Sequence, residues 1–150
     1  MTRRRDFIKK SIMGSAGLAI GGFGFSAKSY SSIIGANDEI RVAVVGMGNR
    51  GIGSHIPEYG RLSGVRIAAV CDPDQERLSA GGQKVSGSFN YKPAQVVDVR
   101  RLMDHKDLDV ITVATMQYWH ALPTIWACET GRHVYVEKPL AHYIWESRQL

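Results

Sequence analysis

Four apolar-rich runs recur along the chain, and each ends in a charged or turn-forming residue. They are IRVAVVG (40–46), VRIAAVCD (65–72), VITVAT (110–115) and HVYVEKP (133–139). Apolar runs that are continuous rather than alternating indicate strands buried on both faces, as in a parallel sheet covered by helices. The pattern therefore predicts a parallel β-sheet in a domain that starts near Asn37.

Two segments between these runs have the periodicity of helices with one apolar face. The faces consist of Val99, Leu102 and Met103 in the first segment and of Leu122, Ile125 and Trp126 in the second. Pro123 and Gly131 suit the first turn and the end of the second helix. A helix after the first strand would contain Pro57, so we expect a kink or a late start there. The alternation of strand and helix predicts a doubly wound α/β sheet of the Rossmann type over residues 37–150.

The first strand ends in a glycine-rich turn, GMGNRG, which places Gly46, Gly48 and Gly51 in G-x-G-x-x-G spacing. The first glycine permits a tight turn, the second lets a pyrophosphate approach the backbone, and the third lets helix and strand pack closely. The following helix then presents its N-terminus to the phosphates. Asn49 and Arg50 lie in the same loop and are further candidate cofactor-binding residues.

Asp72 ends the second strand, about 20 residues after the glycine loop, where a carboxylate can accept a hydrogen bond from an adenosine ribose hydroxyl. This context favours a dinucleotide site over the alternative, a structural turn followed by a solvated aspartate. Pro73 rather than an arginine follows Asp72, which favours NAD over NADP. Arg50 is close in sequence and keeps NADP as the second choice.

Charge is distributed unevenly along the chain. Up to Ala36, six basic residues stand against one acid, which accounts for the whole net charge of +5. The remainder is neutral and offers no basic face for a nucleic acid backbone. Nucleic acid is therefore not an expected partner.

The first 36 residues resemble a twin-arginine export signal. RRDFIK (4–9) is followed by a glycine-rich, mildly apolar run (12–25) that is too short and too weakly apolar for a permanent membrane span. We expect delivery to the periplasm by the twin-arginine export machinery, with cleavage near Ala27 or Ala36, or membrane anchoring if the signal is uncleaved. The alternative is a basic amphipathic arm.

Cysteines and histidines lack the spacing of a metal site, so no metal is predicted. Cys71 and Cys128 lie in apolar, strand-like and helix-like surroundings, and we expect both to be buried free thiols. The histidines interpreted as structural or surface residues are His55, His105, His133 and His142.

Four segments together resemble one protein family. VVGMGNRG, AAVCD, VATMQYWHA and ACETGRHVYVEKPLAH are similar to the N-terminal half of the Gfo/Idh/MocA oxidoreductases, the glucose-fructose oxidoreductase and inositol dehydrogenase group. The most specific part is G-x-x-V-x-x-E-K-P, which starts at Gly131. In this family the fourth strand ends in T-P-x-x-x-H. Here Thr115 and His120 keep their places, and Met116 replaces the proline.

The resemblance implies a catalytic role for Lys138, because the lysine of E-K-P lies beside the nicotinamide and the reacting carbon in this family. An ammonium there can orient a hydroxyl and polarise the carbonyl that forms as hydride leaves. Glu137 would position the cofactor ribose or the nicotinamide, and Thr115 and His120 would lie near the cofactor. Without the resemblance, Lys138 is interpreted as a solvated strand end and His120 as a helix cap.

Family members continue into a larger C-terminal α/β domain that binds substrate, supplies an acid/base pair and forms the oligomer interface. The resemblance implies that this sequence, which ends in HYIWESRQL (142–150), lacks that domain. The final segment is interpreted as the start of a helix leading towards it. We expect a truncated product or fragment that exposes Ile144 and Trp145.

Three functions are compatible with these features. The first is an NAD-dependent oxidoreductase acting on a sugar, cyclitol or related polyol. The second is a glycosidase of the same family, in which NAD transiently oxidises the sugar. The third is a catalytically inactive module that binds NAD. By the resemblance, the residues that would separate the first two lie in the C-terminal domain.

Overall fold

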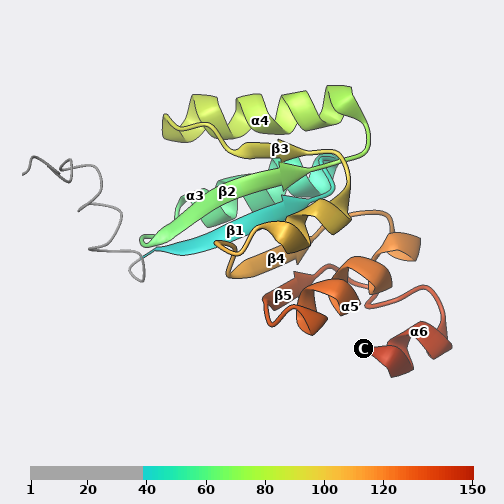
Figure 1. The fold of residues 1–150 in the computed structure, drawn as a ribbon. Helices are drawn as coiled ribbons and strands as arrows, with labels where there is room; N and C mark the ends of the chain where they lie inside the picture. The colour runs from blue at the N-terminus through green and yellow to red at the C-terminus, as the bar shows by residue number, and fades with distance from the viewer. Residues whose placement is uncertain (1–38) are drawn as a thin grey trace, which may run out of the picture. The chain divides into compact units, whose positions relative to one another are not determined.

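The computed structural model describes residues 39–150, which form a five-stranded, all-parallel sheet in the order β3-β2-β1-β4-β5 (Figure 1). The strands are β1 (Ile40–Val45), β2 (Val65–Cys71), β3 (Ala94–Val96), β4 (Val110–Val113) and β5 (His133–Val136). Four of them lie in the predicted apolar runs, and the strand order is that of a Rossmann-type sheet, as predicted. The prediction lacks β3 because its three residues, two of them exposed, form no apolar run.

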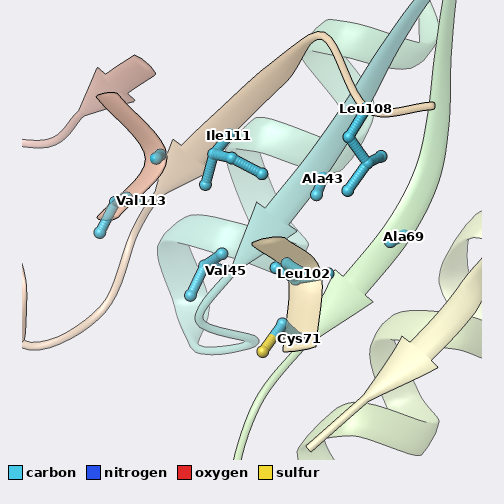
Figure 2. Packing of buried hydrophobic residues seen from close by; sticks show 9 residues of the cluster. Ala43, Val45, Ala69, Cys71, Leu102, Leu108, Ile111 and Val113 are labelled. Carbon is cyan, nitrogen blue, oxygen red and sulfur yellow. The ribbon is translucent and has the colours of Figure 1, made fainter. Parts of the chain in front are cut away.

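Helices cover both faces of the sheet, and each face has its own core. One face carries η2 (Gly51–His55), α3 (Ile56–Gly60) and α4 (Gln75–Phe89), whose core residues include Met47, Ile56 and Val85. The other face carries η3 (Val99–Asp104) and α5 (Ala121–Glu129). Figure 2 shows its core, in which Leu102 packs with Ala43, Ala69 and Ile111. The covering of both faces confirms the doubly wound architecture.

The α4 helix is missing from the sequence prediction because its composition is poor for a helix, with three glycines and three serines among 15 residues. Two features stabilise it all the same. The Asp74 side chain caps the N-terminus by accepting two backbone N–H groups, and Leu78 and Val85 are buried. Gly81 is needed where the helix meets the glycine loop, because a Cβ there would overlap the Sδ atom of Met47.

Pro57 lies inside the helical run that follows the glycine loop. This run is already helical at Asn49 and Arg50, and it then widens into the π-helical turn η2, in which the backbone N–H of Ile56 bonds to the carbonyl of Gly51. Pro57 follows this turn as the second residue of α3 and lacks the N–H that a regular helix would use. The late start expected from the sequence is therefore wrong, and the irregularity before Pro57 is the π-helical turn.

The two helices predicted on the other face differ in outcome. The apolar face of η3 is confirmed, since Leu102 is fully buried and packs with Val99 and Met103. The face predicted for α5 is wrong, because Ala121, Thr124 and Ala127 are buried, whereas Leu122 is 44% exposed and Ile125 and Trp126 are only partly buried. Small residues let α5 pack closely on the sheet, so the larger apolar residues point elsewhere.

The two thiols also differ from each other. Cys71 is buried in the core in Figure 2, as expected, but Cys128 near the end of α5 is exposed, so its predicted burial is wrong. Ala127 of α5 packs in the core on this face of the sheet. Cys128 is the next residue on the helix, so its side chain points in a different direction, away from the sheet.

The end of the chain is helical, as predicted. α6 (Ile144–Gln149) leaves Ile144 78% and Trp145 69% exposed. Within residues 39–150 no helix is long and apolar enough to cross a membrane. The predicted export signal lies outside the described residues.

Candidate functional site: the carboxyl edge of the sheet

The candidate site lies where four parallel strands end at one edge of the sheet. Gly46, Asp72, Thr115 and Glu137 follow the ends of β1, β2, β4 and β5 within two residues. Backbone bonds tie these ends together: Gly46 N to Cys71 O (2.8 Å), Ala114 N to Val45 O (2.8 Å) and Glu137 N to Val113 O (3.0 Å). The strand order reverses between β1 and β4, which is the point where open α/β sheets bind ligands.

Two of the three loop glycines are required by the surrounding backbone, and the third is not. Gly46 has a φ of +94°, and a Cβ there would lie 2.7 Å from the carbonyl carbon of Ala114. A Cβ on Gly51 would overlap the carbonyl oxygen of Gly46. Gly48 differs, because the nearest atom to its added Cβ is the Nη1 atom of Arg77 at 3.6 Å. The space above Gly48 is therefore open to a ligand.

The helix after the loop directs its N-terminus at this space. Its first N–H groups have no partner within the helix, because the first bond of this turn runs from Ile52 N to Gly48 O. Asn49 and Arg50, both exposed, belong to this turn. The arrangement favours an anionic group such as a pyrophosphate.

Asp72 has a role that the sequence does not reveal. Its Oδ2 accepts the backbone N–H of Met47 at 2.7 Å, and its Oδ1 accepts that of Asp74 at 2.9 Å. The residue is 8% exposed, so its carboxylate braces the glycine loop from within. A carboxylate has about four acceptor positions, so Asp72 can still accept a ribose hydroxyl.

The Glu137 carboxylate contacts two basic side chains from the helix after the glycine loop. Its Oε1 lies 2.9 Å from His55 Nε2 and 3.1 Å from Arg50 Nε. The hydrogen bond from His55, helped by the charge of Arg50, lowers the pKa of Glu137, although partial burial opposes this effect. Glu137 is therefore an ionised acceptor at neutral pH.

His55 is the residue of the candidate site that sequence reasoning missed. Its ring is buried, and Nδ1 lies 2.6 Å from Thr112 Oγ1 in the middle of β4. The sequence interpretation as a structural residue overlooks its bond to Glu137. The available signal was its spacing of four residues from Gly51, which puts both on the helix side that faces the sheet.

Lys138 directly follows Glu137, and its side chain is exposed. It forms no salt bridge within residues 39–150. The Lys138–Pro139 peptide bond is cis. The ammonium is therefore free to meet a ligand at this edge, as the sequence prediction requires.

His120 joins two loops of the site. Its ring is 2% exposed, with Nδ1 2.6 Å from the carbonyl of Pro139 and Nε2 3.1 Å from the carbonyl of Thr115. Its side chain makes no capping bond to α5, so the helix-cap alternative is wrong. The ring instead holds the turn after β4, including η4 (Gln117–Trp119), against the turn that contains Lys138. Thr115 contributes its carbonyl to this link.

These residues fit a dinucleotide cofactor. Gly48 leaves room above the backbone, the helix N-terminus favours phosphate, and Asp72 retains acceptor capacity. In the described part of the chain, no group of three or more His, Cys, Asp or Glu side chains could hold a metal ion.

Comparison with known families agrees with this geometry. The Gfo/Idh/MocA family model, described as an oxidoreductase family with an NAD-binding Rossmann fold, matches residues 40–150. The chain therefore belongs to the Gfo/Idh/MocA family, and the described residues form its NAD-binding domain. The family resemblance and the NAD(P) cofactor inferred from the sequence are confirmed at this level.

Curated relatives and solved structures add detail. A glycosyl hydrolase family 109 protein of Shewanella baltica is 31% identical, and an alpha-N-acetylgalactosaminidase of Shewanella oneidensis is 30% identical, each over 98% of this chain. The chain spans 36% of the length of either relative. A myo-inositol dehydrogenase from Lactobacillus casei, solved with NAD(H) and myo-inositol, is 26% identical with a TM-score of 0.66, covering 74% of this chain and 32% of its own. An oxidoreductase structure from Klebsiella pneumoniae is 27% identical with a TM-score of 0.61, covering 75% and 30%.

Proposed function

We propose that the chain forms the cofactor-binding part of an enzyme that moves hydride between NAD and a carbon of a sugar, cyclitol or related polyol. One observation carries the proposal: the glycine loop, Asp72 and the Glu137–Lys138 turn follow the ends of β1, β2 and β5 at one edge of a single parallel sheet. The loop would bind the pyrophosphate, and Asp72 would bind the adenosine ribose. The bound nicotinamide supplies a hydride acceptor that no side chain can replace.

Lys138 would act on the substrate oxygen. Negative charge develops on a hydroxyl oxygen as the adjoining carbon loses hydride, and a nearby ammonium stabilises that charge. Lys138 forms no salt bridge within residues 39–150, so no ion pair has to be broken before its ammonium contacts the substrate oxygen. The same ammonium can orient the hydroxyl before transfer.

A second candidate is a glycosidase that oxidises the sugar only transiently. It is favoured by the names of the curated relatives, which are glycosyl hydrolase family 109 proteins and an alpha-N-acetylgalactosaminidase. The part of the reaction that falls to this chain, binding NAD and stabilising charge at the oxidised carbon, is the same for both candidates.

The test is an assay of a form extended by the downstream reading frame, with NAD against a panel of polyols and glycosides and with Lys138→Ala beside the unaltered form. A dehydrogenase accumulates NADH, whereas the glycosidase releases free sugar without net NADH. In either case Lys138→Ala should lower the rate at least about 100-fold, and NADH affinity should change little. An extended form that binds NADH but forms neither product would instead be an inactive NAD-binding protein, and the catalytic proposal would fail.

We also propose that NAD is preferred over NADP. The buried Asp72 carboxylate can accept a ribose hydroxyl but would repel the phosphate that NADP carries at that position. Competition between NADH and NADPH for the same site tests this preference. Equal affinities would contradict it.

Export by the twin-arginine pathway is a further proposal, together with residence in the periplasm. It rests on RRDFIK (4–9), and the curated relatives align over 98% of the chain and thus into its first 36 residues. Replacing Arg4 and Arg5 by lysine in a reporter fusion should stop delivery. Unchanged delivery would refute the proposal.

A further inference from the structure

We propose that His55 is a positioning residue of the cofactor site, which holds the Glu137 carboxylate so that its second oxygen, Oε2, accepts a hydroxyl group of the bound dinucleotide. The inference rests on the proposed cofactor site and deepens it, because it assigns a task to a buried histidine that acts through Glu137. It also gives the two oxygens of Glu137 different roles, because Oε1 is held by His55 and Oε2 accepts the ligand hydroxyl.

The two oxygens of Glu137 have different surroundings. Oε1 is hydrogen-bonded to His55 Nε2 at 2.9 Å and forms an ion pair with Arg50 Nε at 3.1 Å. Both of these side chains meet Oε1, and the described residues give Oε2 no side-chain hydrogen bond; the backbone N–H of Lys138 is the further group that lowers the pKa of the carboxylate. The side chain is 14% exposed, so the carboxylate is largely buried and still reached by solvent. An ionised oxygen without a side-chain partner at this edge keeps acceptor capacity for a ligand hydroxyl.

The hydrogen-bond pattern fixes the tautomer of His55. Ionised Glu137 can only accept, so the hydrogen of the neutral ring must be on Nε2. Nδ1 is then an acceptor, and the Thr112 hydroxyl 2.6 Å away must donate to it. Thr112 is fully buried in β4 and therefore sets both the orientation and the tautomer of the ring.

The ring is also held by packing. His55 is 5% exposed and lies edge-on to Tyr59 of α3 and Tyr135 of β5, with ring centroids 6.0 and 5.6 Å away. Arg50, the ion-pair partner of Glu137, has a side chain that is 57% exposed. Because an exposed arginine retains rotamer freedom, the buried histidine is the donor that fixes the carboxylate.

Fixing Glu137 also fixes its neighbour. The backbone N–H of Glu137 bonds to Val113 O at 3.0 Å, and its side chain is anchored through His55 to Thr112 on the same strand, β4. The residue is thus held to β4 at both backbone and side chain. Lys138, the next residue, begins its turn from this fixed point.

The first test measures Glu137 without any cofactor, by carboxyl carbon NMR titration of the whole chain. The charged or titratable groups around Glu137 are Arg50, His55 and Lys138, with Tyr59 and Tyr135 packed behind the ring. Glu137 should titrate below the ordinary glutamate range in the unaltered chain and in His55→Gln, whose amide can still donate. It should titrate higher in His55→Leu, and in His55→Asn if the leucine variant fails to fold. An unchanged titration in the variants without the donor would overturn the proposal.

The second test is a double-mutant cycle on NADH affinity. His55→Leu should weaken NADH binding about tenfold, the loss expected for one misplaced charge-assisted hydrogen bond, whereas His55→Gln should bind within about threefold of the unaltered chain. In a Glu137→Gln background, His55→Leu should cause no further loss, because it acts through the missing carboxylate. An equal loss in both backgrounds would show a merely structural role and refute the proposal. Absence of NADH binding by the unaltered chain would count against the proposed function instead, whatever the titration shows.

Discussion

The Asp72 carboxylate accepts the backbone N–H of Met47 at 2.7 Å, which joins the end of β2 to the glycine loop after β1. The acid that the motif assigns to a ribose hydroxyl therefore also fixes the shape of the loop that would bind the pyrophosphate. On the proposed function, one side chain would serve two parts of a single ligand, so its removal should affect both folding and binding.

Asp72→Ala should lower the free energy of unfolding by about 1–3 kcal/mol, because it leaves a buried N–H group unpaired, and it should also weaken NADH binding. Asp74→Ala is the matched control, since it removes the cap of α4 and costs about 1 kcal/mol, without touching the ribose position. Urea unfolding and NADH titration measure the two effects. If both variants bind NADH equally well, the assignment of Asp72 is wrong.

Gly46→Ala should destabilise the protein by about 2 kcal/mol or more, because the left-handed backbone and the contact with Ala114 each cost energy. Gly87→Ala in α4 is the control: its added Cβ meets nothing within 4 Å. It should raise stability by up to about 1 kcal/mol, as alanine favours helix. Thermal unfolding of both variants checks this, and a loss of equal size in both would contradict the structure.

Stability should depend on pH through Glu137. Its pKa lies below the ordinary value of 4.5 because His55 donates to it and Arg50 adds positive charge. A lowered pKa means that the ionised group stabilises the folded state fully above 4.5, and that this contribution disappears as the pH falls through the lowered value. The difference in unfolding free energy between the unaltered chain and Glu137→Gln should therefore shrink on acidification. A difference that stays constant with pH would refute the ionised cluster.

The two cysteines should react differently with an alkylating reagent. Burial raises the pKa of Cys71 to about 12, helped by the nearby charges of Asp72 and Asp98, so at neutral pH it is a protected, protonated thiol. Cys128 is exposed. Mass spectrometry should find one modified cysteine, Cys128, in the native protein and both after unfolding. Modification of Cys71 in the native state would contradict the burial of β2.

The sequence predicts those parts of the fold that depend on long apolar runs or on special backbone geometry. The runs place β1, β2, β4 and β5, and the glycine spacing places the turn at Gly46. α4 could not be predicted because its stability comes from a cap and from close packing on Met47, which override a poor composition. The buried face of α5 was misjudged for a related reason: a close approach to the sheet selects small residues over large apolar ones.

The same distinction holds for the candidate site. Gly46, Asp72 and Lys138 can be predicted because they belong to motifs with a fixed spacing along the chain. His55 belongs to no such motif, because it contacts Thr112 and Glu137, 82 residues further on, only in the folded chain. The second role of Asp72 is hidden for the same reason, because it depends on how β2 lies beside β1.

NADH titration of the folded chain and of Gly48→Ala tests the central claim most directly. An added methyl group at Gly48 meets no protein atom closer than 3.6 Å, so it should leave stability unchanged while occupying the space through which a pyrophosphate approaches. Gly53→Ala, whose Cβ meets nothing within 4 Å, is the control on the helix that follows the loop. We predict saturable NADH binding by the unaltered chain and by Gly53→Ala, and at least about tenfold weaker binding by Gly48→Ala. No saturable binding by a folded sample, or equal affinity in the two variants, would contradict the assignment of a dinucleotide site to this edge of the sheet.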